Sequence, residues 1–337
     1  MSACKAPDRI GVLRLRPQAA IGTPIALQST DGLIVRAAPA IEAIGEGRVD
    51  LDETESPLPG GFDPVFGSYG EALTLTVAVP IVADGQLDAD NAIVRLLRAC
   101  GCGVAISGGE ATVNALTGGC VGLTAADRVP LTIEWAQEGG LTHIWKDCVG
   151  ALTQVAGESS GQAVLMTFVL HCRVVSRVAT TALPAVTFPG QQPFLVAKNS
   201  TLTLGDGDAP ATLYAWTLTT GLAVQEVPSQ LAEGGLGLPF AYQSEPASFD
   251  ISTAQENPYS ADQWARFFGM TSLGDLALKI KGQSATDILE IEAPRPFTSP
   301  QELGAEAGHR TDGREWLLKP DGDDPAWTLV IREEVAS

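Results

Sequence analysis

Alternating apolar and polar residues are the dominant pattern along the chain. Runs of this kind, rich in Val, Thr, Ile and Leu, occur at residues 72–82, 129–135, 161–178, 275–282 and 326–334. Successive side chains of a strand point to opposite faces, so alternating runs are typical of strands that bury one face, while the long apolar run at residues 161–178 is expected to be buried on much of both faces. Helical periodicity over long windows is scarce, and the sequence therefore predicts a mainly β protein.

One clear helical pattern lies at residues 89–100, where apolar side chains recur at a spacing of three and four residues. Asp88 or Asp90 is expected to cap its start, because a carboxylate accepts the free N–H groups of the first turn. Gly101 suits the left-handed position that follows a helix end. The side chains of the predicted apolar face are Ala92, Ile93, Leu96, Leu97 and Cys100.

A second helix of the same outline is predicted at residues 260–268, where Ser260 and Gln263 have capping-box spacing. Overlaying Gly101 on Gly269 gives an offset of 168 residues, about half of the 337-residue chain. The strand runs that end the two halves, "AVLMTFVL" and "AWTLVIRE", also correspond, with the offset slipping to 163. This overlay predicts an internal duplication.

Charge follows the same two-part pattern. Residues 49–94 contain nine acids and residues 199–265 contain eight, and neither stretch contains a lysine or an arginine. Each stretch ends at a predicted helix, just before Arg95 and Arg266. A single acidic run is usually a solvated face, but two runs at equivalent places favour a duplicated unit with one acidic surface.

The predicted organisation has four parts. Residues 1–25 form an N-terminal arm with little structure of its own, and residues 26–178 form the first β unit. Residues 179–193, which contain prolines and no charge, form a linker, and residues 194–337 form the second unit.

The overall charge limits the class of function. The chain has 21 Lys and Arg against 40 Asp and Glu, a net charge of −19. Such a surface repels nucleic acid and anionic membranes, so the charge argues against a DNA-gripping role, although DNA can still pass without binding. The start of the chain lacks an apolar signal core and no 18-residue apolar run occurs, so we expect synthesis in a cytoplasm without a signal peptide or a membrane anchor.

Candidate catalytic chemistry is sparse. The six cysteines lack zinc-site spacing and are expected to be buried or free thiols. Of the three histidines, His143, His171 and His309, His171 is expected to be a packed strand residue. Most tryptophans are expected in the core or at an interface. The sequence therefore predicts no enzyme activity, no cofactor and no metal.

The segment "LLRACG" at residues 96–101, which follows a strand and a glycine-rich loop, resembles a pattern in the major tail tube protein of long-tailed bacteriophages. The later segments "PLTIEW", "WKDCVGALTQVAG" and "AVLMTFVLHCRV" are similar in order as well. The specific resemblance covers roughly residues 33–175, and it reaches the C-terminal half only through the duplication. Cys102 departs from the family, which usually has an aromatic residue there.

The resemblance implies two tandem, related β-sandwich or half-barrel units, each with one flanking α-helix. It implies rings that stack into a tail tube around a channel for DNA. Three doubled chains would make a pseudo-sixfold ring, and a hexamer is the other possibility. The implied partners are other copies of the chain, the tape measure, tail terminator and distal tail proteins, and double-stranded DNA in transit. The implied location is the virion tail, after assembly in the host cytoplasm.

Two sets of residues follow as candidates. The channel lining is expected to include part of Asp50, Asp52, Glu53, Glu55, Glu226 and Glu233, with Asp50 and Asp52 favoured because they share one strand face. The loop "PLPGGFDPVFGSYGE" is expected to reach an adjacent ring, anchored by Phe62, Phe66 and Tyr69, or else to cover its own core. The alternative function is a β-sandwich binding or adhesion module for carbohydrate or protein, which would expose aromatic residues on one face.

Overall fold

The structure is a computed structural model. It describes residues 11–43, 72–81, 87–114, 129–158, 161–180, 182–187, 194–197, 200–204, 213–226, 239–254, 274–281, 287–298, 302–306, 309–322 and 324–333. Within these residues it is mainly β, with antiparallel sheets and one α-helix, as the sequence predicts. No helix in these ranges is long and apolar enough to span a membrane.

The elements of the first half of the chain are β1 (Gly11–Pro17), the 3-10 turn η1 (Ser29–Asp31), β2 (Gly32–Leu33), β3 (Ala40–Ala43), β4 (Ala72–Pro80), α1 (Ala92–Ala99), β5 (Gly103–Ser107), β6 (Glu110–Asn114), β7 (Leu131–Gln137), β8 (Leu141–Gly157) and β9 (Leu165–Ala179). Those of the second half are β10 (Ser200–Leu204), β11 (Ala215–Thr219), β12 (Leu222–Gln225), β13 (Phe240–Gln243), β14 (Ala247–Ala254), β15 (Leu276–Lys281), β16 (Asp287–Ala293), β17 (Pro296–Thr298), β18 (Glu302–Glu306), β19 (His309–Leu318) and β20 (Thr328–Arg332).

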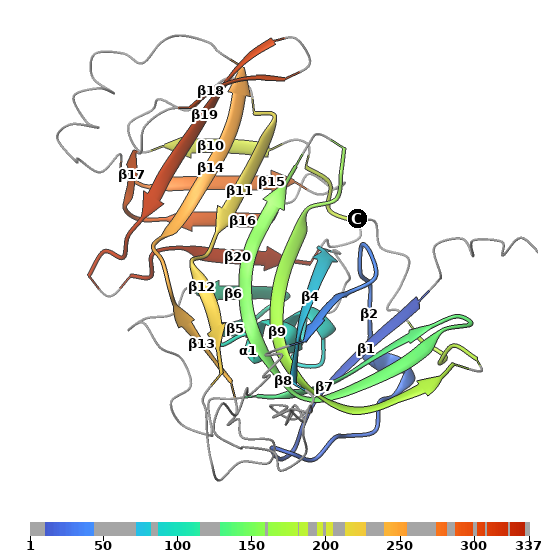
Figure 1. Ribbon diagram of the computed structural model, residues 1–337. Coiled ribbons are helices and arrows are strands. Elements are labelled where there is room, and N and C mark those ends of the chain that lie inside the picture. The colour runs from blue at the N-terminus through green and yellow to red at the C-terminus, as the bar shows by residue number, and fades with distance from the viewer. Residues whose placement is uncertain are drawn as a thin grey trace, which may run out of the picture.

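The largest sheet contains a continuous series of antiparallel strands in the order β3-β4-β9-β8-β11-β14-β19. β17 and β18 lie end to end along the free side of β19 and complete this series. We call it the long series, and Figure 1 shows it running from β17 on the left to β4 on the right. The first part of β8 also pairs with β7, which continues the sheet through β1 to β2.

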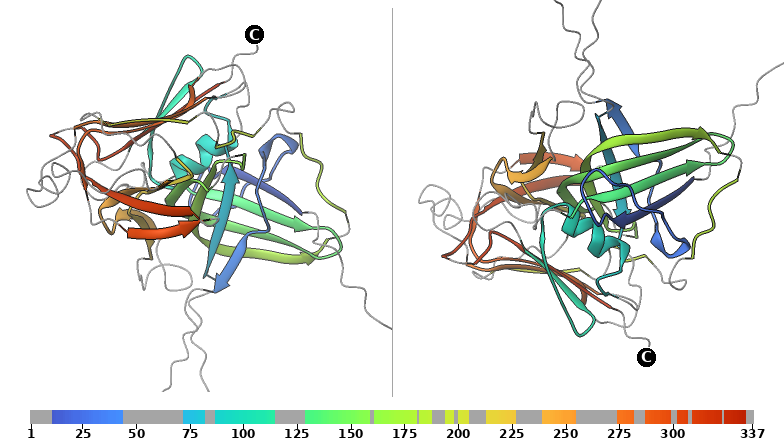
Figure 2. Two further views of the ribbon diagram at one scale, coloured as in Figure 1. Left: turned by 90° about the horizontal axis from the view of Figure 1, so that it is seen from above. Right: turned by 90° about the horizontal axis from the view of Figure 1, so that it is seen from below.

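A second sheet has the order β10-β15-β16-β20-β6-β5. Its strands cross behind the long series in Figure 1, and Figure 2 shows the two sheets as separate layers with α1 between them. Apolar side chains from both sheets and from α1 form one buried cluster. Large fully buried side chains in this cluster include Trp145, Phe168, Phe249, Trp316 and Trp327.

Both sheets contain strands from both halves of the chain. In the large sheet β8 pairs with β11, and in the second sheet β6 pairs with β20. Hydrogen bonds therefore join the predicted units 26–178 and 194–337 on either side of the linker 179–193. The predicted correspondence of "AVLMTFVL" with "AWTLVIRE" is not supported by the pairings, because β9 lies in the large sheet and β20 in the second.

The expected unstructured arm is wrong for Gly11–Pro17, which forms β1. This strand pairs along its whole length with β7, and Leu13 and Leu15 are buried in the core. The segment alternates leucine with arginine, so one face can enter the core while Arg14 pairs with Glu134 on the other face. The prediction gave weight to the basic residues and missed the alternation.

The predicted helix at residues 89–100 is confirmed with a shorter span, Ala92–Ala99. Asn91 is its N-cap rather than Asp88 or Asp90, because the Asn91 side chain accepts a hydrogen bond from the Ile93 amide. Gly101 has the expected left-handed conformation, with a φ of 72°. The predicted helix at residues 260–268 lies outside the described residues.

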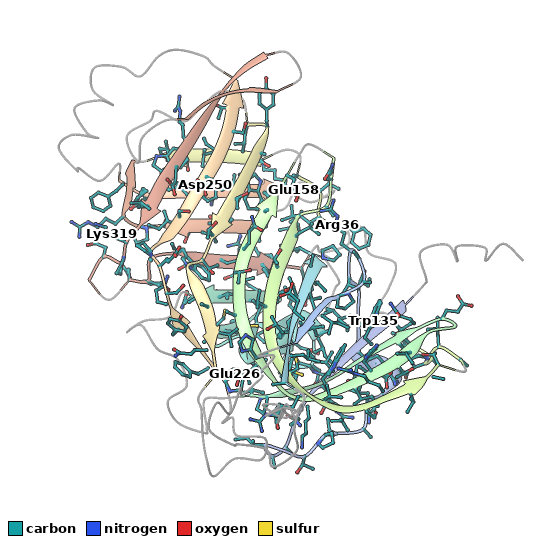
Figure 3. All side chains as sticks on the ribbon, in the orientation of Figure 1. Arg36, Trp135, Glu158, Glu226, Asp250 and Lys319 are labelled. Atoms are coloured by element: carbon teal, nitrogen blue, oxygen red, sulfur yellow. The ribbon has the colours of Figure 1, made fainter. Side chains whose placement is uncertain are left out.

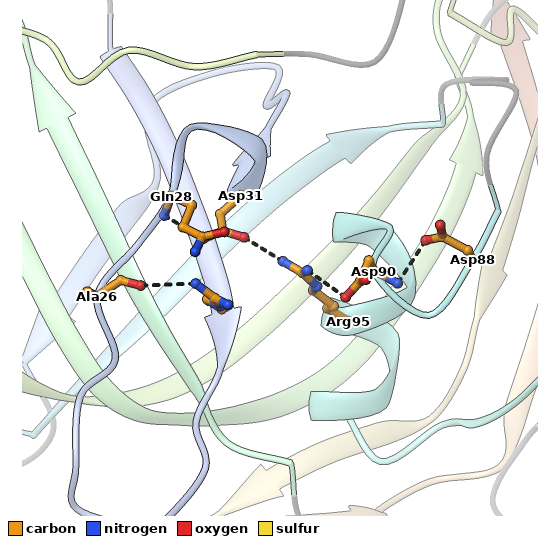
Figure 4. A network of polar contacts seen from close by, with 7 residues as sticks. Ala26, Gln28, Asp31, Asp88, Asp90 and Arg95 are labelled. Atoms are coloured by element: carbon orange, nitrogen blue, oxygen red, sulfur yellow. Dashed lines mark hydrogen bonds and ion pairs between the residues drawn. The ribbon is translucent and has the colours of Figure 1, made fainter.

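A buried ion pair fixes α1 to the turn before β2. Arg95 Nη1 lies 2.7 Å from Asp31 Oδ1, and Arg95 Nη2 lies 2.9 Å from the exposed Asp90 Oδ1 (Figure 4). The other Asp31 oxygen accepts a hydrogen bond of 2.6 Å from the Gln28 amide. Burial lowers the pKa of Arg95, but hydrogen bonds to Asp90 and Asp31 outweigh it and the net pKa is raised.

Candidate functional site

The long series has one face toward the core and one face away from it. Strand register identifies the second face, which we call the open face. On β4 the buried residues Leu73, Leu75 and Val77 alternate with the partly exposed Thr74 and Thr76. Side chains in register with these threonines on neighbouring strands share their face.

The polar side chains of the open face are mainly hydroxyl and acidic, and they lie on β4, β11, β14 and β19, whereas β8 contributes mostly apolar residues. Register places Asp250 of β14 opposite Thr217 of β11 on one side and Glu315 of β19 on the other. Ser248 donates a hydrogen bond of 3.2 Å to Asp250, and Figure 3 labels Asp250 on the upper part of the sheet. The polar open-face residues identified by register are Glu42, Thr74, Thr76, Gln154, Thr167, His171, Thr217, Thr219, Ser248, Asp250, Ser252 and Glu315. The same register places on this face the apolar residues and glycine Ala40, Ala72, Ala78, Pro80, Val149, Ala151, Ala156, Leu165, Val169, Ala215, Gly313 and Leu317.

Basic side chains occur on the described part of the open face at one end. Arg173 of β9 lies beside His171 along the strand and is paired in register with Lys146 of β8. Along the upper part of the described open face, the polar side chains are threonine, serine, aspartate and glutamate rather than lysine or arginine. Because lysine and arginine dominate phosphate binding, this upper surface has little capacity to hold DNA.

Glu226 is the one predicted channel residue that the structure describes. It follows β12, and its Oε1 lies 2.9 Å from His171 Nδ1, with each side chain 15% exposed. Figure 3 shows Glu226 at the lower end of the long series. The pair fixes the end of β12 against the open face, so His171 is a packed strand histidine with an acidic partner.

A hairpin of β12 and β13 forms the lower extension of β11 and β14. β12 follows β11 after a bend at Thr220 and Gly221, and β13 precedes β14. The Thr220 hydroxyl donates to the Leu152 carbonyl, and the Thr220 amide donates to the Thr153 carbonyl at 3.0 Å. Gly221 has a φ of 70°, and a Cβ there would lie 2.2 Å from the Glu245 carbonyl oxygen, so the bend requires glycine.

The long series ends in edge strands, each of which pairs on one side only with a strand in the described part of the chain. At one end β3 pairs with β4, and at the other β17 and β18 pair with β19. Each strand in the series is antiparallel to its neighbour, so β3 runs opposite to β17 and β18. Strands with a free side can pair with another chain.

The remaining predicted site residues lie outside the described residues. These are the channel candidates Asp50, Asp52, Glu53, Glu55 and Glu233 and the loop candidates Phe62, Phe66 and Tyr69. The structure adds Asp250 and Glu315 as acidic open-face residues that the sequence analysis did not select. Each stands between two apolar or core-facing neighbours in an alternating run, and that alternation was the available signal.

The cysteines and tryptophans that the structure describes are buried residues of the core. Cys100, Cys102, Cys148 and Cys172 are buried free thiols, and burial raises the pKa of Cys102 to about 12. All tryptophans within the described ranges are buried, each at most 3% exposed: Trp135, Trp145, Trp216, Trp316 and Trp327. In those ranges no group of three His, Cys, Asp or Glu side chains is placed to hold a metal ion.

Comparison with known proteins adds no family assignment. No protein-family profile matches the chain, and a search of curated proteins finds no significant match.

Proposed function

We propose that this chain is a phage tail tube subunit whose copies form stacked rings, with the open face lining a channel for DNA. The observation that carries the proposal is a continuous antiparallel series with hydroxyl and acidic side chains on the face away from the core. Such a wall offers DNA few cationic contacts, so the duplex can slide without being held.

The strand order supports two related units. β3-β4-β9-β8 and β11-β14-β19-β17 have the same order, and a two-stranded hairpin follows the second strand of each set along the chain, β5–β6 in one and β15–β16 in the other. α1 precedes the first hairpin, and the predicted helix 260–268 precedes the second. Residues 44–71 connect β3 to β4 and residues 220–246 connect β11 to β14, and these connections differ in length by one residue.

Ring closure would pair β3 of one copy with β17 and β18 of the next. The edge strands run in opposite directions, so this junction continues the antiparallel order and removes both free sides. Three copies give the pseudo-sixfold ring, since each copy supplies two units.

Electron microscopy of concentrated protein tests the proposal. Rings with a central opening, and tubes of stacked rings at higher concentration, are the expected result. A chain that stays monomeric at all concentrations, with intact β structure by circular dichroism, would refute the ring. Class averages report whether three or six chains form it.

The channel role has its own test. Replacing Asp250 and Glu315 by lysine puts two cations where two anions stand on the open face of each copy. Tubes should still assemble, and their affinity for duplex DNA should rise and should fall steeply as salt increases. The matched control replaces Asp88 and Glu138 by lysine, since both side chains are exposed and lie outside the long series. Equal DNA binding by the open-face variant and the control would show that the open face does not meet DNA.

The binding-module alternative predicts aromatic residues exposed on one face. Within the described ranges Phe194 and Tyr214 are exposed, but every tryptophan is buried, and the burial of the tryptophans favours the tube over a carbohydrate platform.

A further inference from the structure

A mostly apolar pocket of about 360 Å³ lies at the upper end of β4 and β9. Its walls include Val35, Pro80, Ala163, Leu165 and Phe194. Phe194 is 46% exposed at the pocket, and it is the phenylalanine among the described residues that is classed as exposed. A cavity of about 150 Å³ accepts a benzene ring, so this volume is sufficient for an aromatic side chain.

The pocket is formed by four chain segments that backbone hydrogen bonds hold together. The Arg36 amide donates to the Ala78 carbonyl at 3.0 Å, and the Leu195 amide donates to the Ile81 carbonyl at 2.9 Å. The Val164 amide donates to the Leu195 carbonyl at 2.8 Å. The pocket is therefore preformed, and a ligand does not have to order its walls.

The chain segment 44–71 leaves the sheet at the opposite end of β4. It begins after Ala43 and returns at Ala72, while the pocket is at Pro80. β4 is roughly 26 Å long at the usual rise per residue. Phe66 is six residues before Ala72 and reaches at most about 21 Å from it. The backbone of Phe66 therefore cannot reach the pocket wall at Pro80 of its own chain along β4.

We propose that this pocket receives Phe66 from the segment 57–71 of a copy in the adjacent ring, so that rings stack head to tail. The proposal rests on the proposed tube function and adds the receptor for the stacking contact. Loop and pocket lie at opposite ends of the same strand, and stacking in one direction brings each loop to the pocket of the next ring. Such a heterologous contact repeats without limit, as a tube requires.

The test uses two complementary variants, each purified as rings. Phe194→Asp disables the pocket and leaves the loop intact, while Phe66→Asp disables the loop and leaves the pocket intact. Each variant alone should form rings, and its critical concentration for tubes should rise at least about tenfold. A mixture of the two retains one functional loop–pocket contact, so it should form pairs of rings and nothing longer. Val178→Asp, at the other end of β9 and also on an exposed apolar residue, is the control and should form normal tubes.

The outcomes separate the stacking contact from the tube function. Wild-type tubes together with normal tubes from Phe194→Asp would overturn the pocket assignment and leave the tube function standing. A mixture that stays as single rings would show that loop and pocket do not contact each other. If Phe194→Asp fails to fold, Ala163→Phe fills the pocket without adding charge and should give the same result. Wild-type protein that forms no rings would refute the proposed function, and the stacking contact with it.

Discussion

Removing the Asp31 carboxylate should destabilise the first half of the chain far more than removing the Asp90 carboxylate. Both acids bind the same guanidinium, that of Arg95 (Figure 4). They differ in burial, since the Asp31 side chain is 1% exposed and that of Asp90 is 87% exposed. Asp31→Ala and Asp90→Ala therefore form a matched pair of perturbations at one cation.

The expected magnitudes follow from that difference. Breaking a buried ion pair by removing one partner typically costs about 3–5 kcal/mol, because the other charge remains buried without compensation. Asp90 still contacts Arg95 in Asp31→Ala, so we expect the lower end, about 3 kcal/mol. Asp31→Ala also removes the acceptor for the Gln28 amide. Asp90→Ala removes an exposed pair and should cost less than about 1 kcal/mol.

Urea unfolding followed by circular dichroism and tryptophan fluorescence measures both effects. The midpoint of the transition that includes α1 should fall clearly in Asp31→Ala and scarcely in Asp90→Ala, with the slope unchanged. A double change, Asp31→Leu with Arg95→Met, replaces the pair by apolar side chains and should recover much of the loss. Equal midpoints for the two single variants would refute the argument that burial controls the cost.

Three further predictions concern single sites. Gly150→Ala should lower the free energy of unfolding by about 3 kcal/mol, because the added Cβ would lie 2.1 Å from the Val169 carbonyl oxygen. Gly103→Ala, whose added Cβ has no atom within 4 Å, should change the free energy of unfolding by less than about 0.5 kcal/mol. Similar urea midpoints for the two variants would contradict the steric argument. Burial raises the pKa of Cys102 to about 12, so its thiol should resist iodoacetamide at pH 8 until the protein unfolds, and labelling of the native protein, read by mass spectrometry, would count against this. Burial raises the pKa of Glu290, but hydrogen bonds from Lys279 and Arg332 outweigh it and the net pKa is lowered. The stabilisation from ionised Glu290 is therefore present above the unfolded pKa and is lost as pH falls through the lower folded pKa. Glu290→Gln should consequently lose less stability than the wild type between pH 5 and pH 3, and an equal loss in the two proteins would contradict this prediction.

Local patterns predicted the class of structure and several of its details. Alternation identified β4, β9 and β20, and helical spacing with Gly101 identified α1 and its end. These features depend on neighbouring residues, which a sequence displays directly. The burial of the tryptophans and of the described cysteines also follows from their apolar surroundings.

The pairing between halves was not predictable in the same way. β8 is long enough to pair with β7 and β9 in its first part and with β9 and β11 in its last part. No residue in β8 signals this double use, because strand partners are chosen by packing between distant segments. For the same reason the overlay, whose offset slipped from 168 to 163 towards the chain end, matched β9 with β20 although the two strands lie in different sheets.

The pairing of β8 with β11 has a specific consequence for assembly in the proposed ring. Within one chain it joins the two sets of strands that we propose to be related, and Trp216 packs so closely on Gly157 that a Cβ there would lie 2.5 Å from the indole nitrogen. The pairing of β17 and β18 with β3 would be its counterpart between chains. Association of separate chains costs translational and rotational entropy at every junction, whereas linked strands meet at a high effective concentration. A duplicated chain therefore makes every second junction of the ring intramolecular, and only the junctions at β3 remain to be formed by collision.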